Sequence, residues 1–308
     1  MMNARSFLFL LFFLPTCVSA ELNRHKAEGI SFELVSDVEA FVPGDSFTVG
    51  LNIDLEEGFH TYWKNPGIVG LPVMLEWTLP EGMTAGPIQW PTPERLKMAI
   101  HPAHGFKRDV TLLVEMTSSK ELSEVVANLT CQVRWMARSR TCHPGEAQLA
   151  LSVPVGTETL VNEEKVAVFA AARADLPEEV EGLTLEGTLL AQVGLVLLSA
   201  GGEALASDLE DCYFYSFNGL VSSNRSQTVR RSIQGELLIA MELSEYASDE
   251  SKELLNGVLS VVDSHTGVRK NLWVSMPLAH LRISSLEKGE FSEKVKFVEK
   301  AEGCSCEE

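Results

Sequence analysis

The chain has 308 residues, 45% of them hydrophobic, and its 25 Lys and Arg against 43 Asp and Glu give a formal net charge of -18. Such an acidic chain repels phosphate backbones and bare anionic membrane surfaces, which excludes nucleic acid as a partner and charge-driven membrane binding. The length allows two ordinary domains, each able to bury its own core.

Residues 1–20 predict a secretory signal peptide. Arg5 precedes an unbroken apolar run, and Val18-Ser19-Ala20 offers small residues for cleavage. The alternative, a membrane anchor, is disfavoured because the run is too short to span a bilayer comfortably and a polar chain follows at once. A lipid on Cys17 is disfavoured by the nearby Pro15. No later segment is apolar enough to be transmembrane, so we expect an exported chain that does not itself span the membrane.

Residues 22–155 predict an immunoglobulin-like β-sandwich. The stretch 30–55 alternates apolar and polar residues around a Pro-Gly-Asp turn, and strand patterns return at 109–118, 125–137 and 147–155. The proline-rich segment 88–106 is predicted to be a loop, since proline bars helices and central strands. Short strands separated by Gly and Pro turns are typical of a sandwich.

Residues 156–177 predict a helical linker, with Val166, Phe169 and Ala170 at helical spacing, Thr159 as the cap and Pro177 at the end. Strand patterns resume over 178–282, which predicts a second, smaller β-sandwich. The predicted fold class is therefore mainly β, with two β-sandwich domains joined by a short helix. Residues 283–308 form a charged tail with a Cys-x-Cys motif, for which we expect a short helix followed by a mobile end.

Five cysteines remain once the signal peptide is removed: Cys131, Cys142, Cys212, Cys304 and Cys306. An odd count in an exported protein predicts at least one free thiol or an intermolecular bond. In an oxidising compartment a free thiol is exposed to oxidation, so we expect it to be either buried or used.

An ordered set of aromatic, proline and glycine motifs runs through the first predicted domain: Phe59-His60-Thr61-Tyr62-Trp63, Asn65-Pro66-Gly67, Leu71-Pro72, Trp77, Pro80-Glu81-Gly82 and Trp90-Pro91-Thr92-Pro93. The set resembles the periplasmic N-terminal region of the DsbD/ScsB family of thiol:disulfide interchange proteins. The stretches "SFNGL", "NGVLSVVD" and "LWVSMPL" resemble the second β-module of that family. The resemblance covers about residues 30–280.

The active loop of the family usually reads Trp-x-x-Cys-x3-Cys-x-Pro. Here Trp135 leads to Arg138 in the place of the first cysteine, whereas Cys142 and Pro144 match the second cysteine and its proline. The resemblance implies a periplasmic module without a cofactor that exchanges electrons with a thioredoxin-like periplasmic protein or a membrane thiol reductase. The chain lacks the transmembrane carrier and terminal thioredoxin domain of full-length members, so we expect a stand-alone N-terminal region.

Within this resemblance Cys142 is the predicted attacking thiol, with Arg138 and His143 tuning it. Arg138 and Arg140 can stabilise a thiolate through opposite charge. The predicted loop-shaping residues are Tyr62, Trp63, Trp135 and Pro144, and His60 is assigned to the structural aromatic loop.

A resolving thiol is needed to complete exchange, because the mixed disulfide must collapse into an intramolecular one. The candidates are Cys131, Cys304 and Cys306. Strand parity points Cys131 into the core beside Trp135, which favours a buried hydrophobic role. The two tail cysteines could reach the site, serve a partner or bind a soft metal such as Cu(I). Cys212 is expected to pack in the second core.

The rival interpretation is a non-enzymatic periplasmic binding module on the same fold, for a protein partner or copper. Arg138 favours the rival, whereas the retained Cys142 and the tail thiols favour redox exchange. We predict no metal site, with Met98, His101 and His104 as a weak alternative for copper or zinc.

Overall fold

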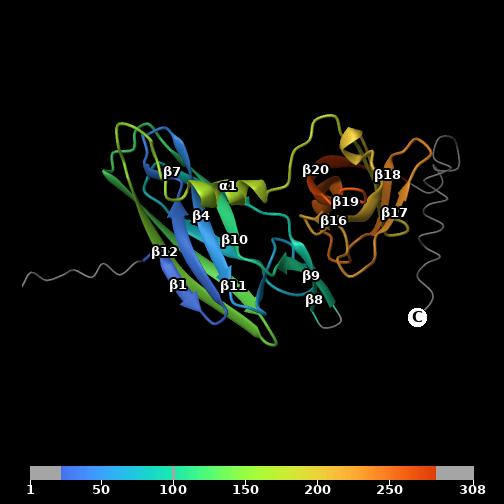
Figure 1. The fold of residues 1–308 in the computed structure, drawn as a ribbon, viewed down its shortest axis with the longest axis horizontal. Coiled ribbons are helices and arrows are strands. Elements are labelled where there is room, and N and C mark those ends of the chain that lie inside the picture. The colour runs from blue at the N-terminus through green and yellow to red at the C-terminus, as the bar shows by residue number, and fades with distance from the viewer. Residues whose placement is uncertain (1–21, 99–100, 282–308) are drawn as a thin grey trace, which may run out of the picture.

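The computed structural model describes residues 22–98 and 101–281, and these form two β-rich units with a helix between them (Figure 1). The mainly β fold class predicted from the sequence is confirmed. The predicted signal peptide and the charged tail with Cys304 and Cys306 lie outside the described residues. In the described part of the chain, no helix is long and apolar enough to cross a membrane.

The first unit is an immunoglobulin-like sandwich of two facing sheets. One has the strand order β1 (Arg24–Ala27), β2 (Ile30–Ser36), β4 (Ser46–Leu55), β10 (Val110–Ser118) and β7 (Met83–Gln89). The other has the order β12 (Cys142–Pro154), β11 (Val126–Arg138), β5 (His60–Tyr62), β9 (His101–Phe106) and β8 (Glu94–Met98), and β6 (Met74–Thr78) also pairs with β11. A short pair joins β3 (Val38–Ala40) to β13 (Leu160–Val161).

Alternation along the strands produces the core of this sandwich. On β2 and β4, every second side chain is buried, including Phe32, Leu34 and Leu51. Trp135 of β11 packs on Phe32 across the sandwich, with ring centroids 4.5 Å apart. The two sheets therefore share one apolar interior, and polar residues of the same strands face outward.

The prediction of a loop over residues 88–106 is wrong for most of that segment, because β8 and β9 form a hairpin there. Pro91 and Pro93 precede β8, so neither interrupts its ladder. Pro102 lies opposite Lys97 of β8, whereas β9 meets β5 only at Gly105 and Phe106. Pro102 therefore has a strand on one side alone and needs no second ladder bond, which is where a strand tolerates proline.

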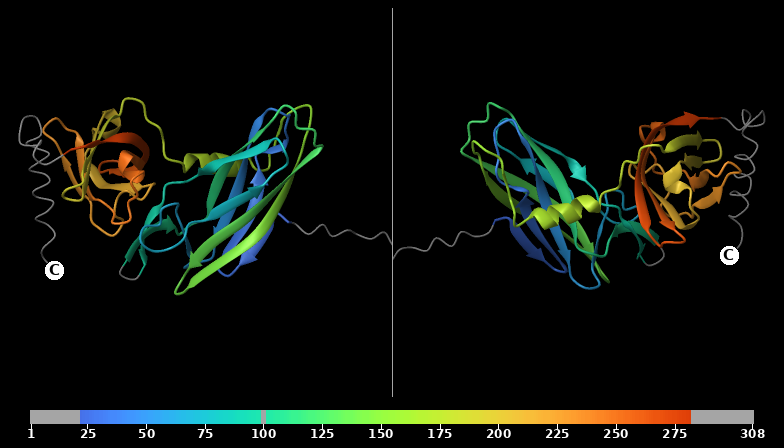
Figure 2. Two further views of the ribbon diagram at one scale, coloured as in Figure 1. Left: turned by 180° about the vertical axis from the view of Figure 1, so that it is seen from behind. Right: turned by 45° about the horizontal axis from the view of Figure 1, so that its top comes forward.

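The helix α1 (Val166–Ala174) lies within the predicted linker but is shorter than predicted, and Thr159 does not cap it. The hydroxyl of Thr159 instead donates to Asp45, at 2.7 Å. Phe169 of the helix is buried with Val35 and Leu113 on the outer face of the five-stranded sheet. The helix thus covers that sheet on the way to the second unit (Figure 2).

The second unit contains seven strands: β14 (Thr184–Leu190), β15 (Leu195–Gly201), β16 (Leu209–Ser216), β17 (Thr228–Arg231), β18 (Leu237–Glu242), β19 (Leu254–Asp263) and β20 (Arg269–His280), with short 3-10 turns η1 (Glu203–Leu205) and η2 (Ser251–Glu253). They form one hydrogen-bonded order, β16-β19-β20-β14-β15-β18-β17. Phe214 of β16 and Ile239 of β18 share one core although they lie near opposite ends of this order, so the sheet folds back on itself.

The two units meet around His104 of β9, which is only 2% exposed. Its Nε2 lies 3.1 Å from the Tyr213 hydroxyl of β16, and its Nδ1 lies 3.3 Å from the Asn65 carbonyl. Trp63 packs edge-on against Tyr215 at 6.2 Å, and the interface side chains belong to the same apolar cluster as the core of the first unit. The interface is therefore continuous with a core.

Because burial lowers the pKa of His104 to about 4, the folded protein excludes a proton that the unfolded chain binds below about pH 6.5. Stability should then be full above pH 6.5 and fall as the pH drops toward 4. We expect a loss of about 2 kcal/mol in the free energy of unfolding between pH 7 and pH 5. Urea unfolding of the wild type and of His104→Gln at both pH values tests this, since the variant should lack most of that loss. Equal losses in the two proteins would contradict the assignment.

Candidate functional site

Three neighbouring strands bring Cys142, Arg138 and His60 side by side. The hairpin of β11 and β12 pairs continuously from Val126 opposite Pro154 to Arg138 opposite Cys142. On its other side, Arg138 is opposite His60 of β5. Directly paired residues place their side chains on the same face of a sheet. The tip of this hairpin therefore carries a row made of a thiol, a guanidinium and an imidazole.

The place of Arg138 has a direct chemical meaning. Directly opposed residues of an antiparallel pair have Cα atoms about 4.5 to 5.5 Å apart, which lies within the range that a disulfide can bridge. Two cysteines at 138 and 142 would thus be positioned to bond across the hairpin. With Arg138 in one of these places, Cys142 is an exposed, free thiol.

Tyr62 forms the floor beneath this row. Its side chain is buried, and its hydroxyl lies within hydrogen-bonding reach of Arg138. Burial raises the pKa of Tyr62, and the nearby Cys142 adds to the effect, so the phenol stays protonated. Gly70 packs flat on the ring: a Cβ there would lie 2.2 Å from a ring carbon, and the φ of +99° suits glycine. The loop after β5 therefore closes over Tyr62.

His60 also belongs to this site, although the sequence predicted only a structural role for it in the aromatic loop. It lies edge-on to Tyr62, with ring centroids 5.7 Å apart. Burial lowers the pKa of His60, and the positive charges of Arg138 and Lys107 lower it further. The imidazole is thus held neutral near two cations. One sequence feature could have predicted that His60 belongs to the site: His60 and Tyr62 are two residues apart, which puts both on one face of a strand.

The structure does not bring His143 to the thiol. His143 follows Cys142 in the strand β12, so the two side chains point to opposite faces. Its Nδ1 lies 3.2 Å from the Glu28 carboxylate and its Nε2 lies 2.9 Å from the Thr141 hydroxyl. The expected tuning of Cys142 by direct contact with His143 is therefore not supported by this geometry.

Cys131 is out of reach of Cys142. Cys131 lies seven positions before Arg138, the partner of Cys142, which is a distance of about 23 Å along the strand. The Cys131 side chain is fully buried, and burial raises its pKa to about 12. It cannot form a disulfide with Cys142 without unfolding. Cys212 lies in the second unit, where burial likewise raises its pKa to about 12.

The predicted loop-shaping residues separate into two groups. Trp135 and Pro144 belong to the hairpin: Trp135 packs against Gly145, and Pro144 lies opposite Met136. Trp63 faces the second unit instead, where its ring meets His104 and Phe217. Trp63 therefore shapes the interface between the units.

The structure does not support a copper or zinc site made of Met98, His101 and His104. His101 and His104 are three residues apart in the strand β9 and so face opposite sides of it, whereas a loop was assumed. His104 is already engaged with Asn65 and Tyr213. Met98 is opposite His101 in the backbone ladder. Within residues 22–98 and 101–281, no group of three or more His, Cys, Asp or Glu could hold a metal ion.

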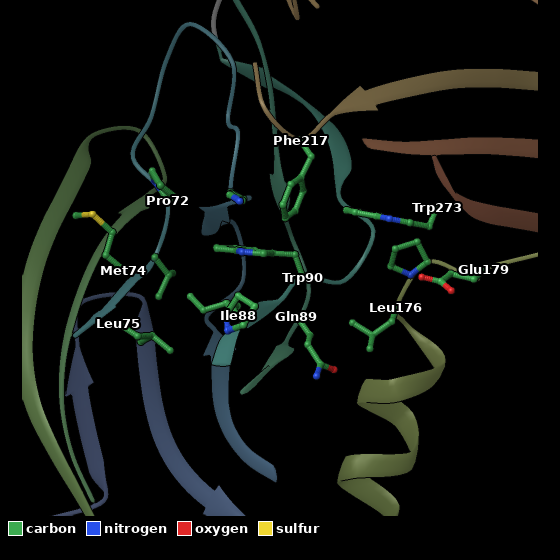
Figure 3. A pocket seen from close by; sticks show the side chains of 14 residues that line it. Pro72, Met74, Leu75, Ile88, Gln89, Trp90, Leu176, Glu179, Phe217 and Trp273 are labelled. Carbon is green, nitrogen blue, oxygen red and sulfur yellow. The ribbon is translucent and has the colours of Figure 1, made fainter. Parts of the chain in front are cut away.

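A second candidate site is an apolar groove of about 730 Å³ between the two units (Figure 3). Met74 and Leu75 lie at one end and Trp273 at the other, with Trp90 and Phe217 between them. Two strands that line it, β6 and β7, each pair with a single neighbour and so leave an edge free. The Lys64 ammonium lies 3.8 Å from the centre of the Phe217 ring.

Comparison with known proteins shows what the first unit is similar to. Residues 31–154 match the family described as "Thiol:disulfide interchange protein DsbD, N-terminal". The N-terminal periplasmic domain of ScsB from Proteus mirabilis is similar in structure, with a TM-score of 0.59, 16% identity, and coverage of 81% of this chain and 94% of that one. A conserved domain protein from Bacillus anthracis gives a TM-score of 0.26 at 8% identity, covering 84% of this chain and 89% of its own. No curated protein matches.

The pairing of Arg138 with Cys142 predicts that Arg138→Cys will form a disulfide across the hairpin, because the backbone positions already have the required spacing. Intact mass should show the loss of two hydrogens, and peptide mapping should place the bond at Cys142. Arg134→Cys is the matched control, since Arg134 lies opposite Glu146 and about 13 Å farther along the strand. A free Cys142 in Arg138→Cys under oxidising conditions would contradict the register.

Proposed function

From the match of residues 31–154 to the family of DsbD N-terminal domains, we propose that the chain is a periplasmic thiol–disulfide interchange module that works through the single thiol of Cys142. The observation that carries the proposal is the exposed Cys142 at the hairpin tip, directly opposite Arg138. In this family the matching loop carries a pair of cysteines, and here one of the pair is retained.

The surroundings of Cys142 suit a reacting thiol. The thiolate is the nucleophile in exchange, and Arg138 lies directly opposite Cys142 on the same face of the sheet. Arg138 is held in place by its strand and by the Tyr62 hydroxyl. The thiol is open to solvent, so a partner disulfide can approach it.

The proposed step begins when the Cys142 thiolate attacks one sulfur of a partner disulfide. A bond forms between Cys142 and that sulfur, the partner disulfide breaks, and the other partner sulfur leaves as a thiolate that takes up a proton. Transfer of two electrons then needs a second thiol to release the partner. Neither Cys131 nor Cys212 is placed to supply it.

The proposed partner is a thioredoxin-like periplasmic protein or a membrane thiol reductase. Support comes from the matched family, whose description names thiol:disulfide interchange, and from the ScsB domain, which is described as periplasmic. The signal-like sequence of residues 1–20 supports export.

Trapping tests the thiol directly. A thioredoxin-like protein with its second active-site cysteine replaced by serine and its first cysteine activated as a mixed disulfide should couple through Cys142 to the full chain in which Cys304 and Cys306 are also replaced by serine, so that no tail thiol competes. We expect Cys142→Ser to lose the coupled product almost entirely, as seen on non-reducing gels. Cys212→Ser is the matched control and should keep it, because that thiol is partly buried and its pKa is raised. Coupling that persists in Cys142→Ser would refute the proposal.

The alternative function, a non-enzymatic binding module, is favoured by one observation, the apolar groove. Its two free strand edges, β6 and β7, can pair with an extended segment, and its walls can take apolar side chains. The occupant proposed for this alternative is therefore an extended apolar segment of a protein partner. The copper version has no supporting cluster among the residues that the structure describes.

Binding without chemistry separates the two functions. Affinity for the same thioredoxin-like protein, with all its active-site cysteines replaced by serine, can be measured by calorimetry. If the groove is the functional surface, Ile88→Lys should weaken binding by at least about tenfold, because a charge is buried in an apolar wall. Thr84→Lys, on the exposed face of the same strand, is the matched control. Unchanged binding in Ile88→Lys would contradict the alternative.

A further inference from the structure

The hairpin tip carries an unusual concentration of cations without acidic partners. Most arginines of this acidic chain pair with carboxylates: Arg24, Arg95, Arg108, Arg134, Arg173, Arg225 and Arg269. Among the described residues, no carboxylate lies within ion-pairing distance of Lys107, Arg138 or Arg140. We call these three residues the cationic rim.

Two members of the cationic rim lie next to the thiol, and the third, Lys107, follows β9, which is separated from β12 by β11 and β5. Arg138 is directly opposite Cys142, and Arg140 is in the exposed turn that joins the two strands. Lys107 follows Phe106, which is opposite Thr61, the residue between His60 and Tyr62. Arg138 is opposite His60 on β11, and Lys107 follows β9 on the other side of β5. The thiol is therefore bordered by positive charge that the folded units leave uncompensated.

Uncompensated cations next to a thiol fit an acidic segment that carries its own cysteine. The chain contains such a segment. From residue 301 to residue 308 the sequence reads "AEGCSCEE", in which Cys304 and Cys306 are accompanied by Glu302, Glu307 and Glu308 and by no cation. Its charge is complementary to that of the cationic rim.

The chain that connects the described structure to the tail cysteines is long compared with the strands of the first unit. The described structure ends at Leu281, and Cys304 lies 23 positions farther along the chain. An extended segment of that length spans up to about 75 Å. The strands β11 and β12, each of 13 residues, are only about 43 Å long. A tether of this length also raises the local concentration of the tail thiols near the site.

We propose that the Cys304-Ser305-Cys306 segment docks on the cationic rim and supplies the thiol that resolves mixed disulfides at Cys142. This rests on the proposed exchange function. A thiolate of Cys304 or Cys306 attacks Sγ of Cys142, the bond from Cys142 to the partner breaks, and a bond from Cys142 to the tail forms. The partner leaves as a thiolate and takes up a proton. In sum, the partner disulfide is reduced to two thiols and two thiols of this chain are oxidised to one disulfide.

The test oxidises the full reduced chain with oxidised dithiothreitol, a neutral disulfide, and follows the Cys142–tail bond by peptide mass over time. We expect this bond in the wild type. Its rate of formation should fall at least about fivefold in Arg138→Gln/Arg140→Gln and in Glu307→Lys/Glu308→Lys, and it should also fall in 1 M salt. Arg225→Gln, which removes a cation paired with Glu242 in the second unit, is the matched control and should leave the rate unchanged.

The outcomes separate this inference from the function on which it rests. A Cys142 that couples to the thioredoxin-like probe but never bonds to the tail would overturn the inference and leave the proposed function standing. A Cys142 that couples to neither would refute both. A tail bond that forms at a rate insensitive to the rim and to salt would overturn the docking role of the rim. Cys142 could instead react faster with oxidised glutathione, an acidic disulfide, than with oxidised dithiothreitol and form no bond to the tail. That result would overturn the inference and assign the cationic rim to binding an acidic thiol from another molecule.

Discussion

The register between β11 and β12 is the constraint on which the site depends. Leu129, Cys131, Val133, Trp135 and Ala137 are all buried on one face of β11, so a slip of one residue would turn this whole set toward solvent. The apolar face thereby fixes which residue is opposite which along 13 pairs, up to Arg138 and Cys142 at the tip. The positions of Arg138 and Cys142 are therefore fixed by side chains that pack several residues away. Burial of those side chains in the core of the sandwich stabilises this register.

Strand parity in the sequence was sufficient to predict the sandwich and the inward direction of Cys131, whereas the alignment of Cys142 with the second cysteine of the family loop came from the resemblance to that family. The same parity also separates His143 from Cys142, because adjacent residues of a strand face opposite ways. The neighbours across strands were harder to foresee. His60 and Arg138 are 78 residues apart in the chain and meet only because β5 adds to the edge of β11. No local pattern encodes that pairing. The hairpin of β8 and β9 was not predicted because proline usually indicates a loop. The sequence does not show that Pro102 has a paired strand on one side only, where proline is tolerated.

The interface between the two units joins the two domains and creates a groove that neither domain has alone. Trp63, His104 and the tyrosines of β16 fill the junction, and Arg95 pairs with Asp211 at 2.7 Å on its border. Because aromatic side chains hold the units together here, the apolar walls of the groove are brought face to face nearby. The groove therefore belongs to neither unit alone, and its shape depends on the packing around His104.

The replacement of one cysteine by Arg138 also changes what the hairpin can signal. A loop with two opposed cysteines has two covalent forms, and a partner can distinguish them by the shape of the loop. With Arg138 opposite Cys142, the hairpin has no disulfide of its own to make or break. In the proposed exchange, the redox state of Cys142 is then carried by the group attached to its sulfur. A partner would then recognise the group bonded to Cys142 and not a change in the shape of the hairpin.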